Sequence, residues 1–101
     1  MKLKYQNQTI DVTTTTNNTI IKYRFQKLYH AIIIKECKRY SSIANKQRID
    51  AVMTDDDLTI LYIKLDMHEN TFIENTDATT TILLPPNSIQ NLEVGQKFIL
   101  E

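Results

Sequence analysis

Two apolar runs, at residues 49–53 and 58–63, stand on either side of three consecutive aspartates. Both runs are rich in β-forming residues. Apolar runs of this length, separated by a turn-prone acidic cluster, are typical of a β-hairpin. We therefore expect a hairpin at the centre of the fold, with Asp55, Asp56 and Asp57 in its turn.

Further runs of the same kind predict the remaining strands. They lie at residues 3–6, 9–16, 31–36, 71–73, 79–84 and 98–100. The first two would form a hairpin that turns near Asn7 and Gln8. Residues 31–36 include three consecutive isoleucines, a pattern typical of a strand buried on both faces. Pro85 and Pro86 would end the strand at 79–84, because proline cannot donate to a β-ladder.

A helical pattern interrupts these strands once. Ile21, Phe25 and Leu28 recur at helical spacing after Asn17, which can cap a helix. Residues 38–48 are polar and irregular and predict a loop or a short turn of helix, and residues 88–92 fit a single helical turn. The whole pattern predicts a mostly β fold: a small, single-domain antiparallel β-barrel or sandwich over residues 1–101, with one short α-helix at about 19–29.

Composition excludes several classes of protein. Gly95 is the only glycine, which argues against phosphate loops and dinucleotide-binding folds, since both need several glycines at fixed spacing. No apolar run approaches the length of a membrane span, and no apolar signal region follows the N-terminus. Cys37 is the only cysteine, which excludes an internal disulfide and suits a reducing compartment. We therefore expect a cytoplasmic protein that does not contact membranes.

The net charge is zero, but the charges are segregated along the chain. Residues 22–48 contain eight cations and one anion (8 − 1 = +7), and residues 49–78 contain eight anions and one cation (1 − 8 = −7). The blocks could neutralise each other in the fold or form two patches. A basic patch with interleaved aromatics would suit nucleic acid. An acidic patch would suit the basic groove of a partner protein, as in an inhibitor encoded by a phage or a mobile element.

The order of features also resembles a known family. A Cys-Lys pair that begins at Cys37 stands twelve positions before an Ile-Asp pair that begins at Ile49 and includes Asp50. The predicted hairpin DAVMTDDDLTILYI, the proline-ended run ILLPPNSI and a Leu-x-Val-Gly-x-Lys close at residues 92–97 follow. Over about residues 37–100 this resembles the uncharacterised bacterial family called domain of unknown function 192, especially its short members from low-GC bacteria. The resemblance implies a compact β-barrel or sandwich and no particular reaction.

The chain departs from the family where a site would be expected. The family's motif between the cysteine and the Ile-Asp pair contains a histidine and a methionine. Ser41 and Asn45 occupy these positions here, and the acid of the family's Glu-Leu-Pro in the late strand is replaced by Leu83. A site built on that motif would be altered in this chain.

Few residues suggest chemistry. A catalytic cysteine needs a base within hydrogen-bonding reach, and only His30 and His68 are available to Cys37. Asp50 stands at the start of a predicted core strand, where a charge needs a partner. We expect a structural ion pair, with Arg24 as the first choice, or a cap at the strand end, rather than a general base. We expect no metal ion and no cofactor.

We therefore expect a non-catalytic module that contacts another protein. Its candidate interaction surface comprises Arg39, Tyr40, Arg48, Asp55, Asp56 and Asp57. The alternatives are an inhibitor that uses its acidic face, a nucleic-acid binder that uses residues 22–48, and a divergent enzyme in which Cys37, Asp50 and a histidine converge. The sequence predicts neither the oligomeric state nor the identity of the partner.

Overall fold

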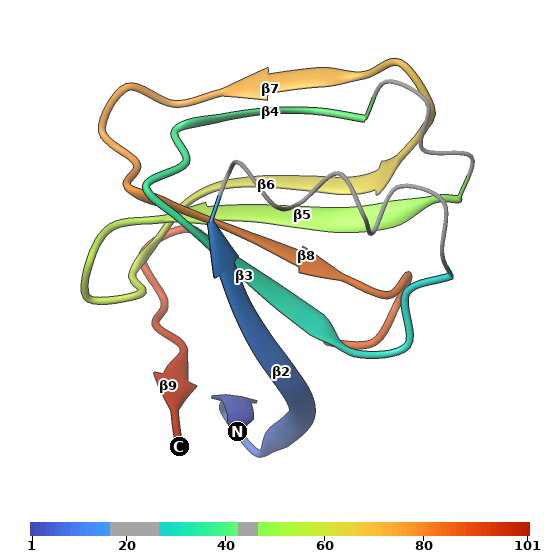
Figure 1. Ribbon diagram of the computed structural model, residues 1–101. Helices are drawn as coiled ribbons and strands as arrows, with labels where there is room; N and C mark the ends of the chain where they lie inside the picture. The colour runs from blue at the N-terminus through green and yellow to red at the C-terminus, as the bar shows by residue number, and fades with distance from the viewer. Residues whose placement is uncertain (17–26, 43–46) are drawn as a thin grey trace.

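The computed structural model describes residues 1–16, 27–42 and 47–101 (Figure 1). Within these residues all regular structure is β. The strands are β1 (Lys2–Tyr5), β2 (Gln8–Thr16), β3 (Ala31–Lys35), β4 (Arg39–Ser41), β5 (Ile49–Thr54), β6 (Ile60–Met67), β7 (Phe72–Glu74), β8 (Thr80–Leu84) and β9 (Ile99–Leu100). The expected helix is not seen: residues 27–29 are irregular, and its other residues, 19–26, lie outside the described part of the chain.

Seven strands form one sheet in the order β6-β5-β8-β3-β2-β1-β9, and β4 pairs with β7 in a second sheet. The larger sheet curls into a half-barrel, and the β4–β7 ribbon lies above β6 and β5 and runs nearly parallel to them (Figure 1). The expectation of a mostly β domain is confirmed. The expected purely antiparallel sheet is wrong at one pair, because β2 and β3 run parallel.

Strand β2 forms the bend of the sheet. Its first half pairs with β1, from Gln8 to Asp11, and its second half pairs with β3, from Val12 to Thr16. One long strand therefore takes part in two successive ladders. This arrangement carries the sheet around towards its other edge.

The C-terminal segment links the two edges of the curled sheet. Strand β9 pairs with β1. Just before it, the Ile60 N–H donates to the Gln96 carbonyl at 2.8 Å, and the Phe98 N–H donates to the Leu58 carbonyl at 3.1 Å. The strand at one end of the sheet, β9, thus follows directly on residues that bond to β6, the strand at the other end, and to Leu58 before it.

The buried side chains form two clusters, one on each face of the sheet. Ile32 and Ile34 belong to the cluster beneath the β4–β7 ribbon, whereas Ala31 and Ile33 belong to the cluster inside the half-barrel. Successive residues of a strand point to opposite faces. The expectation that residues 31–36 are buried on both faces is therefore confirmed for these four positions.

Three local predictions need correction. Residues 38–48 were expected to form a loop or a short turn of helix, but Arg39–Ser41 is a strand, because it pairs with Phe72–Glu74. Residues 88–92 contain bends and no helical turn. The first hairpin turns at Gln6 and Asn7, one position earlier than expected.

Candidate binding groove

The central hairpin is present as expected, and its turn is held by its first aspartate. The Asp55 carboxylate accepts hydrogen bonds from the Asp57 N–H at 2.9 Å and the Thr59 N–H at 3.0 Å. The Leu58 N–H donates to the Asp55 carbonyl at 3.1 Å. Asp55 is thus used within the turn, whereas the side chains of Asp56 and Asp57 are exposed.

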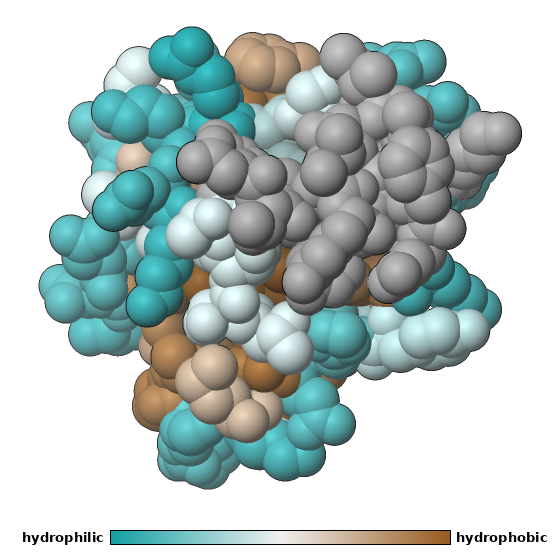
Figure 2. Space-filling view, in the orientation of Figure 1, coloured by the Kyte–Doolittle hydropathy of each residue, from teal (hydrophilic) through white to brown (hydrophobic). Residues whose placement is uncertain are grey.

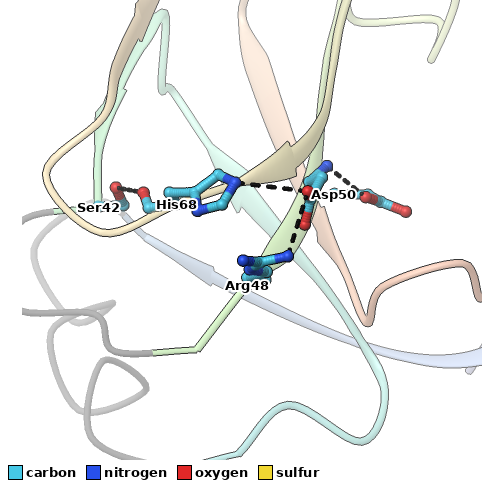
Figure 3. A network of polar contacts seen from close by, with 5 residues as sticks. Ser42, Arg48, Asp50 and His68 are labelled. Atoms are coloured by element: carbon cyan, nitrogen blue, oxygen red, sulfur yellow. Dashed lines mark hydrogen bonds and ion pairs between the residues drawn. The ribbon is translucent and has the colours of Figure 1, made fainter.

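Asp50 is a buried structural carboxylate, only 4% exposed. Its Oδ1 accepts the Asp66 N–H at 2.9 Å (Figure 3). Its Oδ2 accepts the Asn87 N–H at 3.0 Å. Asp66 and Asn87 both have positive φ, at 52° and 61°. Asp50 therefore holds an irregularity in β6 and the turn after the two prolines. Arg24, its expected ion-pair partner, lies outside the described residues.

Polar side chains gather around Asp66, next to Asp50, but they do not form a catalytic triad. Arg48 Nη1 and His68 Nε2 lie 3.5 Å and 3.4 Å from the same Asp66 carboxylate oxygen. Ser42 is fully buried, and its hydroxyl donates to the His68 main-chain carbonyl at 2.5 Å (Figure 3). Because this hydroxyl bonds to main chain and not to the imidazole, the geometry lacks the serine–base contact that nucleophilic catalysis requires.

Cys37 lies away from Asp50. Its thiol is buried and donates to the Arg39 carbonyl at 3.0 Å. The Cys37 N–H bonds to Thr79, whereas Asp50 pairs with Leu84, five residues further along. At about 3.3 Å per residue, this places Cys37 and Asp50 about 16 Å apart. The structure therefore does not bring together the groups of the enzyme alternative.

The residues of the expected interaction surface are also separated. Tyr40 is 3% exposed and packs in the core, so its placement on a surface is wrong. Arg39 pairs with Glu74 at 3.2 Å on the β4–β7 ribbon. Arg48 precedes β5 and the aspartates follow it, so about 20 Å of strand separates them. The three aspartates remain together in one turn.

A groove opens at the end of the half-barrel, next to the aspartate turn. Its volume is about 460 Å³, and Ile33, Leu58 and Leu100 supply its apolar floor. These residues come from β3, the β5–β6 turn and β9. Thr14 of β2, Thr80 of β8 and Thr79 just before β8 also line it. In Figure 2 hydrophobic atoms gather at the lower part of the molecule, around β9.

Charged side chains form the rim of this groove. Lys35, Glu36 and Asp56 line it, and all three are exposed. None of them belongs to an ion pair among the described residues. With Asp57 beside Asp56 in the same turn, the rim carries more acid than base.

Two residues of the groove have an unusual backbone conformation. Leu58 and Glu36 have φ values of 64° and 55°. The left-handed region disfavours side chains other than those of glycine, asparagine and aspartate. Strained conformations of this kind gather at ligand sites. Five further described residues outside the groove share this conformation, so it does not single out the groove: Gln6, Asp66, Asn70, Asn87 and Asn91.

Sequence reasoning identified only Asp56 among the residues that line the groove. The others come from strands and turns that are far apart in the chain and lack any shared motif. Among the residues that the structure describes, no group of three or more histidine, cysteine or acidic residues could hold a metal ion. The same residues include no helix long and apolar enough to cross a membrane.

Comparisons with known proteins support the fold and give no function. No family model and no curated protein matches the chain. A crystal structure of a protein of unknown function from Novosphingobium aromaticivorans resembles it with a TM-score of 0.80. The two are 7% identical, and the match covers 99% of this chain and 84% of the other. At this identity the likeness shows the fold alone, so the function of this chain cannot be determined from its relatives.

Proposed function

We propose that the chain is a non-catalytic binding module whose binding site is the groove at the open end of the half-barrel. The groove itself is the observation that carries the proposal. Ligand sites are concave and mostly apolar, with a few placed polar groups and volumes of about 300–1,000 Å³, and they favour the mouths of barrels. The groove, with a volume of about 460 Å³, an apolar floor and a charged rim, fits this description.

The side chains that could act as nucleophile or base lie outside the groove and have structural roles, which supports a function without catalysis. The thiol of Cys37, the hydroxyl of Ser42 and the carboxylate of Asp50 are buried and bonded to main-chain groups. Among the described residues that line the groove there is neither histidine nor cysteine. Its carboxylates and its amine can recognise charge, while its aliphatic side chains can exclude water.

Titration of the ¹⁵N-labelled chain with two small probes tests this proposal. Isobutylammonium and isovalerate carry similar branched aliphatic groups and opposite charges. We expect amide shifts at Ile33, Leu58 and Leu100, which form the floor, and larger shifts with the cation. Absence of shifts in the groove with both probes would contradict the proposal.

Two neighbouring residues of β9 provide a matched pair of variants. Leu100 lines the groove, whereas Ile99 points to the opposite face, since successive residues of a strand alternate. Leu100→Ser should weaken the binding of isobutylammonium, and Ile99→Ser should leave it unchanged. Equal loss in both variants would show that the probes bind elsewhere.

The nucleic-acid alternative receives less support than the groove. Tyr40 is buried and cannot stack on a base, and Arg39 and Arg48 are each engaged by a carboxylate. The alternative of an inhibitor with an acidic face is supported by the position of Asp56 on the rim of the groove.

Two further expectations from the sequence stand as proposals. One is the relationship with domain of unknown function 192, supported by the spacing of Cys37, Asp50 and the residues up to Leu100. The other is a cytoplasmic location, supported by the free and buried thiol of Cys37.

A further inference from the structure

We infer that the groove accepts an extended, cationic segment of another protein, which pairs with the main chain of β9 at Leu100. This inference rests on the proposed binding function and adds the chemical class of the partner. Three features of the described residues carry it: unbonded main-chain groups, an aliphatic floor and unpaired carboxylates.

The main-chain groups of Leu100 face away from β1. Lys2 and Glu101 exchange two hydrogen bonds, each of 2.8 Å. In an antiparallel ladder, bonded and non-bonded pairs alternate, so the next pair, Leu3 with Leu100, is a non-bonded one. The N–H and C=O of Leu100 therefore point to the open side of β9. No hydrogen bond to either group is found within the described residues.

An extended segment can use such an edge by adding one strand to the sheet. Main-chain hydrogen bonds then supply affinity, and alternate side chains enter pockets. Leu100 lines the groove together with Ile33 and Leu58. A segment paired at Leu100 would direct one aliphatic side chain onto this floor. A small apolar ligand would leave the Leu100 main-chain groups unused.

The charge of the rim selects a cationic segment. Asp56, Asp57 and Glu36 are exposed and have no ion-pair partner among the described residues, whereas the carboxylate of Asp55 is occupied within its turn. Lys35 is the one base among the residues that line the groove. Complementary charge gives an interface specificity and speeds association. An anionic segment would instead meet like charge at the aspartate turn.

A short capped peptide that alternates lysine and leucine is the probe, titrated against the full ¹⁵N-labelled chain. We expect shifts at the amides of Leu100, Leu58 and Thr80, and contacts between the peptide main chain and β9 in nuclear Overhauser spectra. The matched peptide that alternates glutamate and leucine should not bind. Affinity should fall as salt is added, because the rim charges are exposed.

Substitutions at the rim test the role of charge. Asp56→Asn together with Asp57→Asn should weaken the lysine peptide about five-fold, the effect expected for two exposed pairs. Neither side chain takes part in the hydrogen bonds of the turn, so the fold should be retained. Glu69→Gln, an exposed acid on the β6–β7 turn, serves as the control and should leave affinity unchanged.

The outcomes separate this inference from the proposed function. If isobutylammonium binds in the groove and the lysine peptide does not, the extended partner is excluded and the binding function stands. If the glutamate peptide binds equally well, selection by charge is overturned. If the free chain is dimeric in sedimentation equilibrium, with the Leu100 amide protected from exchange, a second copy occupies the groove and the inference fails.

Discussion

Asp50 shows how one residue can hold both an irregularity in a strand and a turn. Its two carboxylate oxygens accept main-chain N–H groups from β6 and from the turn after Pro86, and both donors belong to residues with positive φ. An unpaired buried carboxylate would be costly, so the two donors justify its burial. The irregularity that it holds lies in the edge strand β6, where such bulges discourage pairing with other chains.

Asp50→Asn should lower the free energy of unfolding by about 2 kcal/mol, because an amide can accept one of the two hydrogen bonds and turns its NH₂ towards the other donor. Urea denaturation at neutral pH measures this change. Asp11→Asn is the control: Asp11 is exposed, and the pKa of its carboxyl is lowered by the hydrogen bond and charge of Lys2. An equally small effect for both variants would contradict the structural role of Asp50.

Leu58 combines partial burial against the core with a φ of 64°. Leu58→Ile keeps the apolar volume but places a β-branched side chain in the left-handed region, which is poorly tolerated. We expect a loss of about 1–2 kcal/mol in the free energy of unfolding. Leu61→Ile, at a half-buried position of β6 without positive φ, should change it by less than about 1 kcal/mol. Thermal and urea unfolding of the two variants, measured in parallel, decides the matter.

At the scale of elements, the β4–β7 ribbon is joined to the larger sheet through Ser42. The Ser42 hydroxyl donates to the His68 carbonyl and accepts the Thr71 N–H at 2.8 Å. The Ser42 N–H also donates to the Thr71 carbonyl at 2.9 Å. One buried serine thus fixes the connection between β6 and β7 beside the end of β4.

Ser42→Ala should destabilise the protein by about 2 kcal/mol, since it leaves the Thr71 N–H without its acceptor. The loss should be local: amide hydrogen exchange should speed up in β4 and β7 and stay slow in β3 and β8. Ser88→Ala gives the contrast, because the buried Ser88 hydroxyl has no hydrogen-bond partner in the described structure. That variant should be neutral or slightly stabilising, and a loss comparable to that of Ser42→Ala would refute this interpretation.

The predictability of each element followed the range of its interactions. The β5–β6 hairpin could be predicted because its pattern and its turn residues are local. Strand β4 could not, because Tyr40 is its only buried apolar residue and its pairing with Ile73 depends on chain more than 30 residues away. The parallel pairing of β2 with β3 depends on the path of the chain between them, which no local pattern encodes.

At the scale of the whole molecule, the side chain of Phe98 anchors the C-terminal segment by packing inside the half-barrel. It is 1% exposed, and its ring centroid lies 5.2 Å from that of Tyr5. Phe98→Ala should cost about 4 kcal/mol, the usual loss for a buried phenylalanine. Phe72→Ala, at a position that is 59% exposed, should change stability by less than about 0.5 kcal/mol. Similar midpoints of urea unfolding for the two variants would show that Phe98 does not hold the edges together.

The groove belongs to this largest scale, which explains why the sequence did not reveal it. Its floor joins residues 33, 58 and 100, which meet only when the sheet has curled. The aspartate turn was recognised from sequence, and the apolar residues that lie beside it in the groove were not. The expectation for Tyr40 failed for the same reason, because burial depends on the β4–β7 ribbon as a whole.

The linkage of the two edges of the sheet also constrains how the chain acquires its structure. The Lys4–Glu101 ion pair joins residues that are 97 positions apart. Chains dominated by such distant contacts fold slowly, because a large loop must close before any contact rewards it. The central hairpin can form early, whereas the groove is completed only when β9 docks. In a refolding experiment, the contacts of the groove should therefore appear after those of the central hairpin.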